Sequence, residues 1–277
     1  MVKPTYALVL ACAVLASSAA GCASSGNLPE ARGGPAATAV AKPFVLVSGA
    51  FMGAWGWSAV AAGLRAQGAK VTVVELPAHG ADTTPLSGAT LDAYVAKVGS
   101  AIDATGDSVV LVGHSMAGMV ITSVAEQMPD KIAKLVYLAA FVPKDGDTLE
   151  AVATKDTASH LVQALQIDKT NGVAKLPTDK LRDIFCADCA APETAELTSH
   201  YRDEPLAPFG APVHPTAANW GRVPRYYIHT KLDNALTYAW QQSMTAGVTF
   251  RGTTSLDAGH APFLSQPDAV VKALLGF

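Results

Sequence analysis

Short apolar runs alternate with longer stretches of mixed polarity along most of this chain. Most of the runs are rich in Val and Leu, and several have no polar residue inside them, which is typical of strands buried on both faces of a parallel sheet. The pattern predicts six strands, at Phe44–Val47, Lys70–Val74, Val109–Val112, Leu135–Leu138, Arg225–His229 and Thr249–Leu256.

The stretches between these runs repeat their apolar residues at helical spacing. In the helix predicted over residues 91–104, one face carries Leu91, Tyr94, Val95, Val98 and Ile102. Such a stripe is what a helix needs in order to cover a sheet. Further helices are expected directly after residue 115 and at Ser58–Ala66, Leu236–Met244 and Pro267–Leu275. Strands and helices in alternation predict an α/β fold with a parallel, doubly wound sheet of about six strands.

The alternation stops between Lys144 and about Trp220. This segment has no buried strand run, and its second half is crowded by Pro192, Pro205, Pro208, Pro212 and Pro215. We interpret residues 144–224 as an inserted, mainly helical cap over the carboxyl edge of the sheet, with helices near Leu149–Leu165 and Thr178–Phe185. The domain that contains this insertion is expected to span residues 43–277.

The amino-terminal residues predict export. Lys3 precedes an apolar run from Tyr6 to Ala16, which suits a signal-peptide core but is too short to span a bilayer. Small residues then precede Cys22, as in the bacterial lipoprotein cleavage box. We expect residues 1–21 to be a lipoprotein-type signal peptide and Cys22 to be lipidated. Cleavage before Gly21 by an ordinary signal peptidase is the alternative.

Residues 22–42 are rich in Ala, Gly, Ser and Pro and have almost no large side chains. Such a segment cannot bury enough surface to fold, so it is expected to be a flexible tether. The expected location is the bacterial cell envelope or periplasm, with membrane anchoring through the lipidated cysteine, or secretion if the anchor is not formed.

Composition narrows the classes of partner. Of the 277 residues, 50% are hydrophobic and 16% are charged, which is enough for one large core. The formal net charge is −3 and no basic cluster is found, so the chain has no electrostatic footprint for nucleic acid. We exclude nucleic acid as a partner.

Residues 108–121 read SVVLVGHSMAGMVI, which predicts a strand, a sharp turn and a helix. A serine on such a turn projects its hydroxyl from the carboxyl end of the strand, and small neighbours allow the tight bend. The motif G-x-S-x-G appears here as GHSMA, with Ala117 at the second small position and Gly118 directly behind it. Ser115 is the candidate nucleophile.

A serine hydroxyl needs an adjacent base, and the base needs a third group to hold its tautomer. In a doubly wound sheet, these groups lie on loops that follow strand carboxyl ends. Asp233 follows one predicted strand and His260 follows another, in the segment Asp257-Ala258-Gly259-His260. The chain order Ser115, Asp233, His260 is the one expected of an α/β-hydrolase.

Other titratable residues are weaker candidates. Asp257 is the rival acid, although its place three residues before His260 better suits a loop cap. His114 is expected to pack beside the nucleophile, and His79 to lie in a surface loop.

Acyl transfer also needs two N–H groups aimed at the oxyanion that develops on the attacked carbonyl. Met116, directly after the nucleophile, would provide one of them. The loop after the first strand, Ser48-Gly49-Ala50, would provide the other, best from Ala50.

Cys186 and Cys189 form a C-x-x-C pair in the expected cap. One pair supplies only two ligands, so no zinc or other metal site is expected. On a helix, positions i and i+3 are close enough for a disulfide, and an exported protein would meet an oxidising compartment. Plain buried thiols are the alternative.

Together these segments resemble the plant methyl-salicylate-esterase and hydroxynitrile-lyase group of α/β-hydrolases, with its bacterial esterase relatives. The resemblance spans nearly the whole chain from residue 43 and rests on FVLVSGAFMGAWGW (44–57), VGHSMAGMV (112–120), LAAFVP (138–143), residues 225–233 and Gly259-His260. It implies an α/β-hydrolase fold with a six-stranded core under a cap, and no cofactor. It also implies a triad of Ser115, Asp233 and His260, with Ala50 and Met116 as oxyanion donors.

Ser48 departs from the pattern of this group, which nearly always has a His at that position to brace the oxyanion loop.

The expected function is that of a serine carboxylesterase, which hydrolyses small to medium esters through an acyl-enzyme. The alternatives are a carbon–carbon lyase of the same fold and a non-catalytic exported binding lipoprotein. The lyases carry a Thr at the position of Gly49 and a Lys directly after the catalytic His, where this chain has Ala261.

Overall fold

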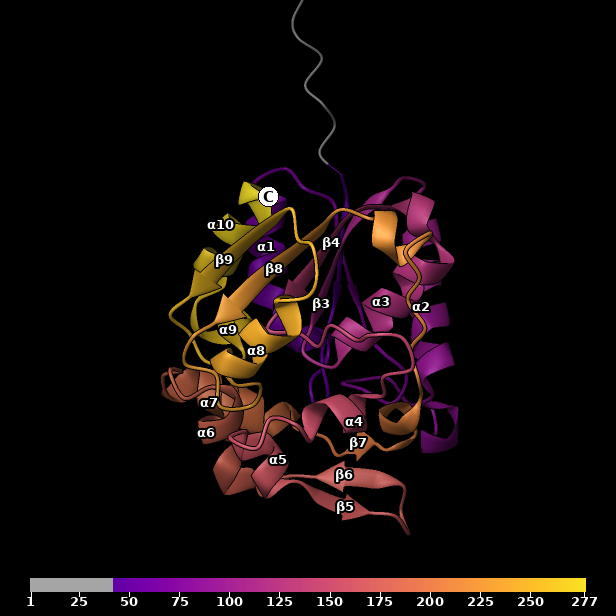
Figure 1. Cartoon of the computed structure of the whole chain (residues 1–277). Coiled ribbons are helices and arrows are strands. Elements are labelled where there is room, and N and C mark those ends of the chain that lie inside the picture. Colours follow the sequence, from indigo (N-terminus) through magenta and orange to yellow (C-terminus); the bar gives the residue numbers. More distant parts are fainter. Residues whose placement is uncertain (1–41) are drawn as a thin grey trace, which may run out of the picture. The chain divides into compact units, whose positions relative to one another are not determined.

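The computed structural model describes residues 42–277, whose centre is a six-stranded sheet (Figure 1). The strand order is β2-β1-β3-β4-β8-β9, and all neighbours are parallel. The bounds are β1 (Phe44–Val47), β2 (Val71–Val74), β3 (Val109–His114), β4 (Ile132–Leu138), β8 (Arg225–Thr230) and β9 (Gly252–Leu256). All six predicted strands are therefore confirmed, although β9 begins at Gly252 instead of Thr249.

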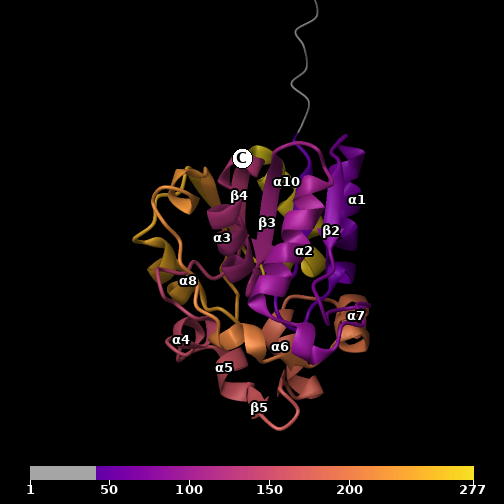
Figure 2. The same cartoon turned by 90° about the vertical axis from the view of Figure 1, so that its right-hand side faces the viewer.

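Helices cover both faces of this sheet (Figures 1 and 2). Side chains alternate along each strand, so Val45 and Val47 enter one hydrophobic cluster and Phe44 and Leu46 enter the other. The first cluster is covered by α2 (Leu91–Asp103), α3 (Ala117–Gln127) and α8 (Tyr238–Thr245), and the second by α1 (Ser58–Ala66), α9 (Pro262–Ser265) and α10 (Pro267–Gly276). The predicted α/β-hydrolase fold is confirmed.

The segment after β4 carries short helices and a small sheet beyond the carboxyl ends of the core strands (Figure 1). Its helices are α4 (Leu149–Ala153), α5 (His160–Ala164), α6 (Leu181–Phe185) and α7 (Ala191–His200). Its strands, β5 (Gln166–Asp168), β6 (Val173–Lys175) and β7 (Glu204–Pro205), pair antiparallel. Strands this short show no sequence period, which is why the sequence predicted none of them.

The single helix predicted at Leu149–Leu165 is wrong, because α4 and α5 are separate. Ser159 starts α5 by accepting the N–H of Val162, and buried Asp156 in the intervening turn accepts the N–H and the hydroxyl of Thr237. In a continuous helix, Asp156 and Ser159 would not be placed to make these hydrogen bonds. The helix predicted at Thr178–Phe185 begins as a 3-10 turn and is α-helical only from Leu181.

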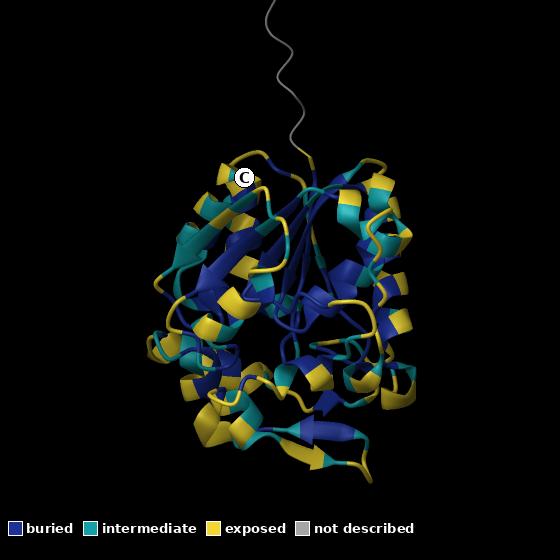
Figure 3. Cartoon of the chain, viewed as in Figure 1, coloured by how far each residue is buried: buried dark blue, intermediate teal, exposed yellow. Residues whose placement is uncertain are grey.

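Burial follows this division of the chain (Figure 3). The four inner strands β1, β3, β4 and β8 are buried along most of their length, whereas the edge strands β2 and β9 are partly exposed and β5 exposes one edge of the small sheet to solvent. Among residues 42–277, no helix is both long and apolar enough to cross a bilayer. The expected signal peptide, Cys22 and nearly all of the expected tether lie outside the described residues.

Candidate active site

Ser115 lies on the turn between β3 and α3, with a φ of 55°. A non-glycine residue rarely adopts this left-handed conformation, so the turn must be held by tight packing around it. A Cβ added to Gly113 would lie 2.8 Å from the Ile121 side chain, and one on Gly118 would overlap the carbonyl oxygen of Phe141. The two glycines therefore let α3 pack against β3 and β4 closely enough to force the turn. At the second small position of the motif, the methyl group of Ala117 is small enough to fit.

The loop after β1 packs directly against this turn. A Cβ on Gly49 would lie 2.6 Å from the Cβ of Ser115, so only glycine allows the approach. Neither Ala50 N–H nor Met116 N–H donates to another group within the described part of the chain, whereas the N–H of Phe51 is bound. Both expected oxyanion donors are thus free to bind a substrate oxygen.

Ser48 braces this loop from inside. Its buried hydroxyl donates to the carbonyl oxygen of Gly53 at 2.8 Å, which closes the loop across its base. The serine is shorter than the histidine expected from the family resemblance, but it still provides a hydrogen bond within this loop.

Asp233 and His260 are brought together from the loops after β8 and β9. The Oδ2 atom of Asp233 lies 2.8 Å from Nδ1 of His260, and both side chains are buried. A carboxylate only accepts, so Nδ1 of the ring carries the proton and Nε2 holds a free lone pair. Within residues 42–277, Nε2 has no hydrogen-bond partner. It is therefore available as a base.

Four further donors orient the Asp233 carboxylate. Oδ1 accepts the N–H groups of Ala235 and Leu236, both at 2.8 Å, and Oδ2 accepts from the Thr230 hydroxyl and the Gln241 amide. These donors compensate for burial of the charge. The rival Asp257 is exposed and pairs instead with Lys231 at 2.9 Å, away from His260.

His114 connects the nucleophile turn to the His260 loop. Its Nε2 lies 2.8 Å from the carbonyl oxygen of His260, and the two ring centroids are 4.5 Å apart. Burial is the main cause that holds the pKa of His114 well below its usual value, and electrostatic repulsion from the neighbouring His260 ring lowers it further. His114 is consequently neutral and packs, as the sequence analysis expected.

A model of the "Alpha/beta hydrolase family" matches residues 44–273. The chain belongs to this family. The chain is similar to "Putative methylesterase 11, chloroplastic" of Arabidopsis thaliana, with 35% identity over 244 residues, and spans 63% of that protein's length and 84% of its own. It is also similar to "Methylesterase 7" of the same plant, with 31% identity over 84% of this chain and 95% of that one.

Among solved structures, the structure of this chain is similar to that of a pyrethroid hydrolase from Sphingobium faniae JZ-2. The sequence identity is 26% and the TM-score is 0.73, and the match covers 86% of this chain and 97% of that one. The family resemblance expected from the sequence motifs is confirmed by these comparisons.

A cavity of about 470 Å³ opens above Ser115. The core contributes the oxyanion loop, Met116 and Phe141, and the segment after β4 contributes apolar side chains that include Leu149, Leu161, Leu165 and Phe209. These lining residues could not be predicted from the sequence, because helices this short and so far apart along the chain show no common motif. An apolar chamber over a serine hydroxyl suits a hydrophobic small molecule.

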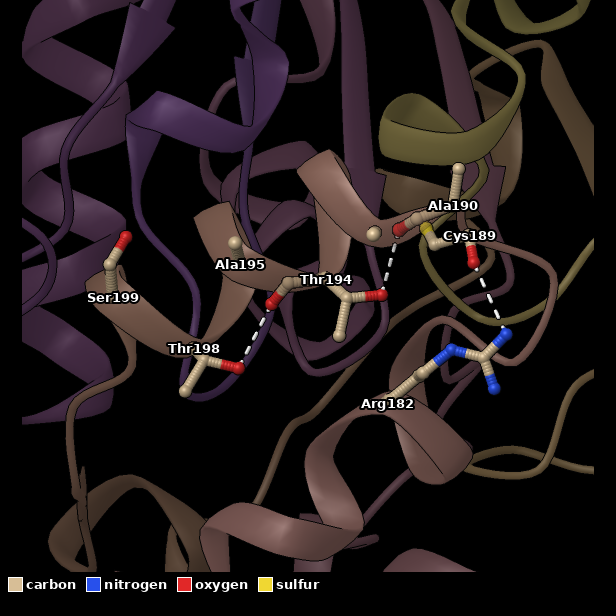
Figure 4. A pocket seen from close by; sticks show the side chains of 8 residues that line it. Arg182, Cys189, Ala190, Thr194, Ala195, Thr198 and Ser199 are labelled. Atoms are coloured by element: carbon tan, nitrogen blue, oxygen red, sulfur yellow. Dashed lines mark hydrogen bonds between the residues drawn. The ribbon is translucent and has the colours of Figure 1, made fainter.

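A second hollow lies against α6 and α7 on the outside of the domain (Figure 4). Its polar side chains are already bound to nearby backbone: Arg182 donates to the carbonyl oxygen of Cys189, Thr194 to that of Ala190, and Thr198 to that of Thr194. None of the candidate site residues lines it. We therefore assign no part in the chemistry to this hollow.

Cys186 and Cys189 are joined by a disulfide. The pair lies on a turn after α6, where the N–H of Cys189 donates to the carbonyl oxygen of Cys186, and not within a helix as the spacing suggested. Asp188 lies beside the sulfur atoms, but three potential ligands fall short of the four that a structural zinc site requires. The carbonyl oxygen of Phe185, directly before Cys186, accepts the N–H of Ala261 at 2.8 Å. This hydrogen bond joins the cysteine turn to the His260 loop.

Proposed function

We propose that the hydrolase is a serine carboxylesterase that acts on small to medium esters through an acyl-enzyme. The observation that carries the proposal is the buried Asp233–His260 pair, whose free Nε2 belongs to a loop in contact with the strained turn of Ser115. The similarity to methylesterases and to a pyrethroid hydrolase supports ester hydrolysis as the reaction.

In the proposed first half-reaction, the Ser115 oxygen attacks the ester carbonyl carbon while Nε2 of His260 takes the hydroxyl proton. The carbonyl π electrons move onto oxygen, and the N–H groups of Ala50 and Met116 stabilise that charge. Asp233 holds the imidazolium that has formed. The intermediate then collapses, the bond to the alkoxy oxygen breaks, and the Nε2 proton leaves with the alcohol.

The second half-reaction releases the acyl group. A water molecule attacks the acyl carbon and gives a proton to Nε2 of His260, and the same two N–H groups bind the new oxyanion. Collapse breaks the bond to the Ser115 oxygen, which recovers its proton from Nε2. The products are one carboxylic acid and one alcohol, and the triad returns to its starting state.

Two positions favour hydrolysis over cyanohydrin cleavage by a lyase. There is no room for a Thr at Gly49, because even a Cβ would lie 2.6 Å from Ser115. Ala261, directly after His260, is fully buried and carries no positive charge that could stabilise a leaving cyanide. The site instead provides free N–H groups for an ester oxyanion.

A panel of p-nitrophenyl esters tests this proposal. We expect turnover from acetate through about octanoate and little with palmitate, because an apolar chamber of about 470 Å³ receives a medium chain but not a long one. A fluorophosphonate should label Ser115, as measured by mass spectrometry of the tryptic peptide. Cyanide release from mandelonitrile without ester turnover would contradict the proposal, and absence of turnover and labelling together would favour a binding protein.

We also propose that the protein is exported and anchored through a lipid on Cys22. The support is the signal-like run from Tyr6 to Ala16 and the small residues before the cysteine. Stable anchoring needs more than one acyl chain, and Cys22→Ala removes the residue that would carry them. The variant should therefore move from the detergent phase to the aqueous phase in Triton X-114 partitioning. Esterase activity should not change. A wild-type protein that starts at Gly21 and carries no lipid would contradict this.

A further inference from the structure

A buried carboxylate that follows the cap helices contacts the oxyanion loop. Glu204 lies in β7 and is fully buried, and its Oε2 accepts the N–H of Phe51 at 2.6 Å. The same oxygen lies 3.0 Å from Nε2 of His79, which comes from the loop after β2. Three segments far apart in the sequence therefore meet at one oxygen atom.

Phe51 is the residue directly after the expected oxyanion donor Ala50. Its φ is 63°, a conformation that a bulky side chain keeps only when its surroundings impose it. The ring stacks on Tyr201 with centroids 5.8 Å apart, and the N–H is held by Glu204. The peptide plane between Ala50 and Phe51 is thus oriented from the cap side, and with it the backbone that presents the Ala50 N–H.

His79 is held as a cation by its two acceptors. The ring is buried, with Nδ1 3.0 Å from the carbonyl oxygen of Pro77 and Nε2 beside the Glu204 carboxylate. Both acceptors need a proton on the nitrogen that faces them, which is satisfied only by the imidazolium. Burial lowers the pKa of His79, but the charge and hydrogen bond of Glu204, aided by the charge of Glu75, outweigh it and leave the pKa raised. This residue was expected in a surface loop, and that prediction was wrong.

The pair is poorly suited to a role in stability alone. Buried ion pairs rarely repay the desolvation of their charges. In addition, Oε1 of Glu204 and the hydroxyl of the neighbouring Tyr94 have no hydrogen-bond partner among the described residues. A charge-assisted acceptor does, however, hold a backbone N–H more firmly than a neutral one.

The same segment also holds the loop that carries His79. Arg202, two residues before Glu204, donates to the carbonyl oxygens of Gly80 at 2.7 Å and Asp82 at 3.0 Å. On the core side, Glu75 accepts the N–H groups of Ala54 and Ala81 and so joins the loop after β1 to the loop after β2. Displacement of β7 would therefore disturb both loops together.

We propose that Glu204 and His79 are positioning residues for the oxyanion hole. Their ion pair fixes the Phe51 N–H and so keeps the Ala50 N–H aimed at the reacting carbonyl. Because Glu204 lies in β7, the oxyanion hole is complete only when β7 is packed against the oxyanion loop. This role rests on the proposed esterase function. Neither side chain touches the substrate, so both act through the backbone of the oxyanion loop.

Glu204→Gln tests the role with little change in shape, because the amide oxygen can still accept while the charge is lost. We expect kcat for p-nitrophenyl butyrate to fall by about 10- to 100-fold with KM within about twofold, since misaimed oxyanion donors weaken the transition state more than the bound ester. Binding of a trifluoromethyl ketone, whose adduct carries an oxyanion, should weaken by a similar factor. Circular dichroism checks that the variant is folded.

Glu126→Gln is the matched control. Glu126 lies at the far end of α3 from Ser115 and also accepts two backbone N–H groups, those of Thr216 and Trp220. It should keep wild-type kcat and ketone affinity. His79→Gln should reproduce the kcat loss of Glu204→Gln, and the double variant should be little worse than either single one, because both changes break one interaction.

If the wild-type enzyme is active and labelled, three results would overturn the positioning role. They are an unchanged kcat in Glu204→Gln, an effect of Glu204→Gln on KM alone, and an equal loss of kcat in Glu126→Gln. A wild-type protein that neither hydrolyses the ester nor reacts with a fluorophosphonate would overturn the proposed function itself, and the positioning role would fall with it.

Discussion

Ser115→Ala is expected to lower kcat for p-nitrophenyl butyrate by about 10⁵- to 10⁶-fold, the scale seen when a triad nucleophile is removed. Without the hydroxyl no acyl-enzyme can form, and only direct attack by water beside the oxyanion hole remains. Stability should change by less than about 1 kcal/mol, because the substitution removes one oxygen atom and retains the Cβ at the turn. Initial rates and a thermal melt measure the two effects.

The same variant decides whether the nucleophile is assigned correctly. Fluorophosphonate labelling should disappear completely, since the reagent bonds to the serine oxygen. Ser123 on α3 provides a control serine, because its hydroxyl is bound to the carbonyl oxygen of Met119. Ser123→Ala should be labelled and active like the wild type. Retained turnover or labelling in Ser115→Ala would show that another residue is the nucleophile.

Asp233→Asn is expected to lower kcat by about 10⁴-fold. Oδ1 accepts the N–H groups of Ala235 and Leu236, so the amide oxygen of the asparagine must take that position. Its NH₂ group then faces Nδ1 of His260, which can accept only in the other tautomer. The proton moves to Nε2, and no base remains for the Ser115 hydroxyl.

Asp257→Asn is the control for the acid, since it makes the same chemical change one loop away. Its carboxylate is 79% exposed and, within residues 42–277, pairs only with Lys231, so kcat should stay within about twofold of wild type because exposed ion pairs contribute little. Steady-state kinetics at pH 8 compare the two variants. A large loss in Asp257→Asn beside a small one in Asp233→Asn would reassign the acid.

Local patterns predicted the core of this domain well. Strands such as Val109–Val112 are continuous apolar runs because both of their faces are covered, and helices such as α1 and α2 carry one apolar stripe. The turn at Ser115 needs small residues on both sides, which leaves a visible motif. Where one physical requirement acts on neighbouring residues, the sequence records it.

The cap and the supports of the site left no comparable signal. The break between α4 and α5 depends on Asp156 meeting Thr237, and α7 is mostly polar along its length, which gives no clear stripe. The disulfide was left open by a spacing that fits several arrangements. For the break between the two helices, the deciding partner lies 81 residues further along the chain.

The sequence by itself therefore determined the order of strands and helices, the hydrolase family and the positions of Ser115, Asp233 and His260 after their strands. Only the tertiary structure decided which acid meets the histidine, how the apolar chamber closes, and that Glu204 and His79 meet behind the oxyanion loop. The physical reason is the separation along the chain over which each interaction acts. Periodicity and turn chemistry act between neighbours, whereas pairing of buried charges joins residues 125 positions apart.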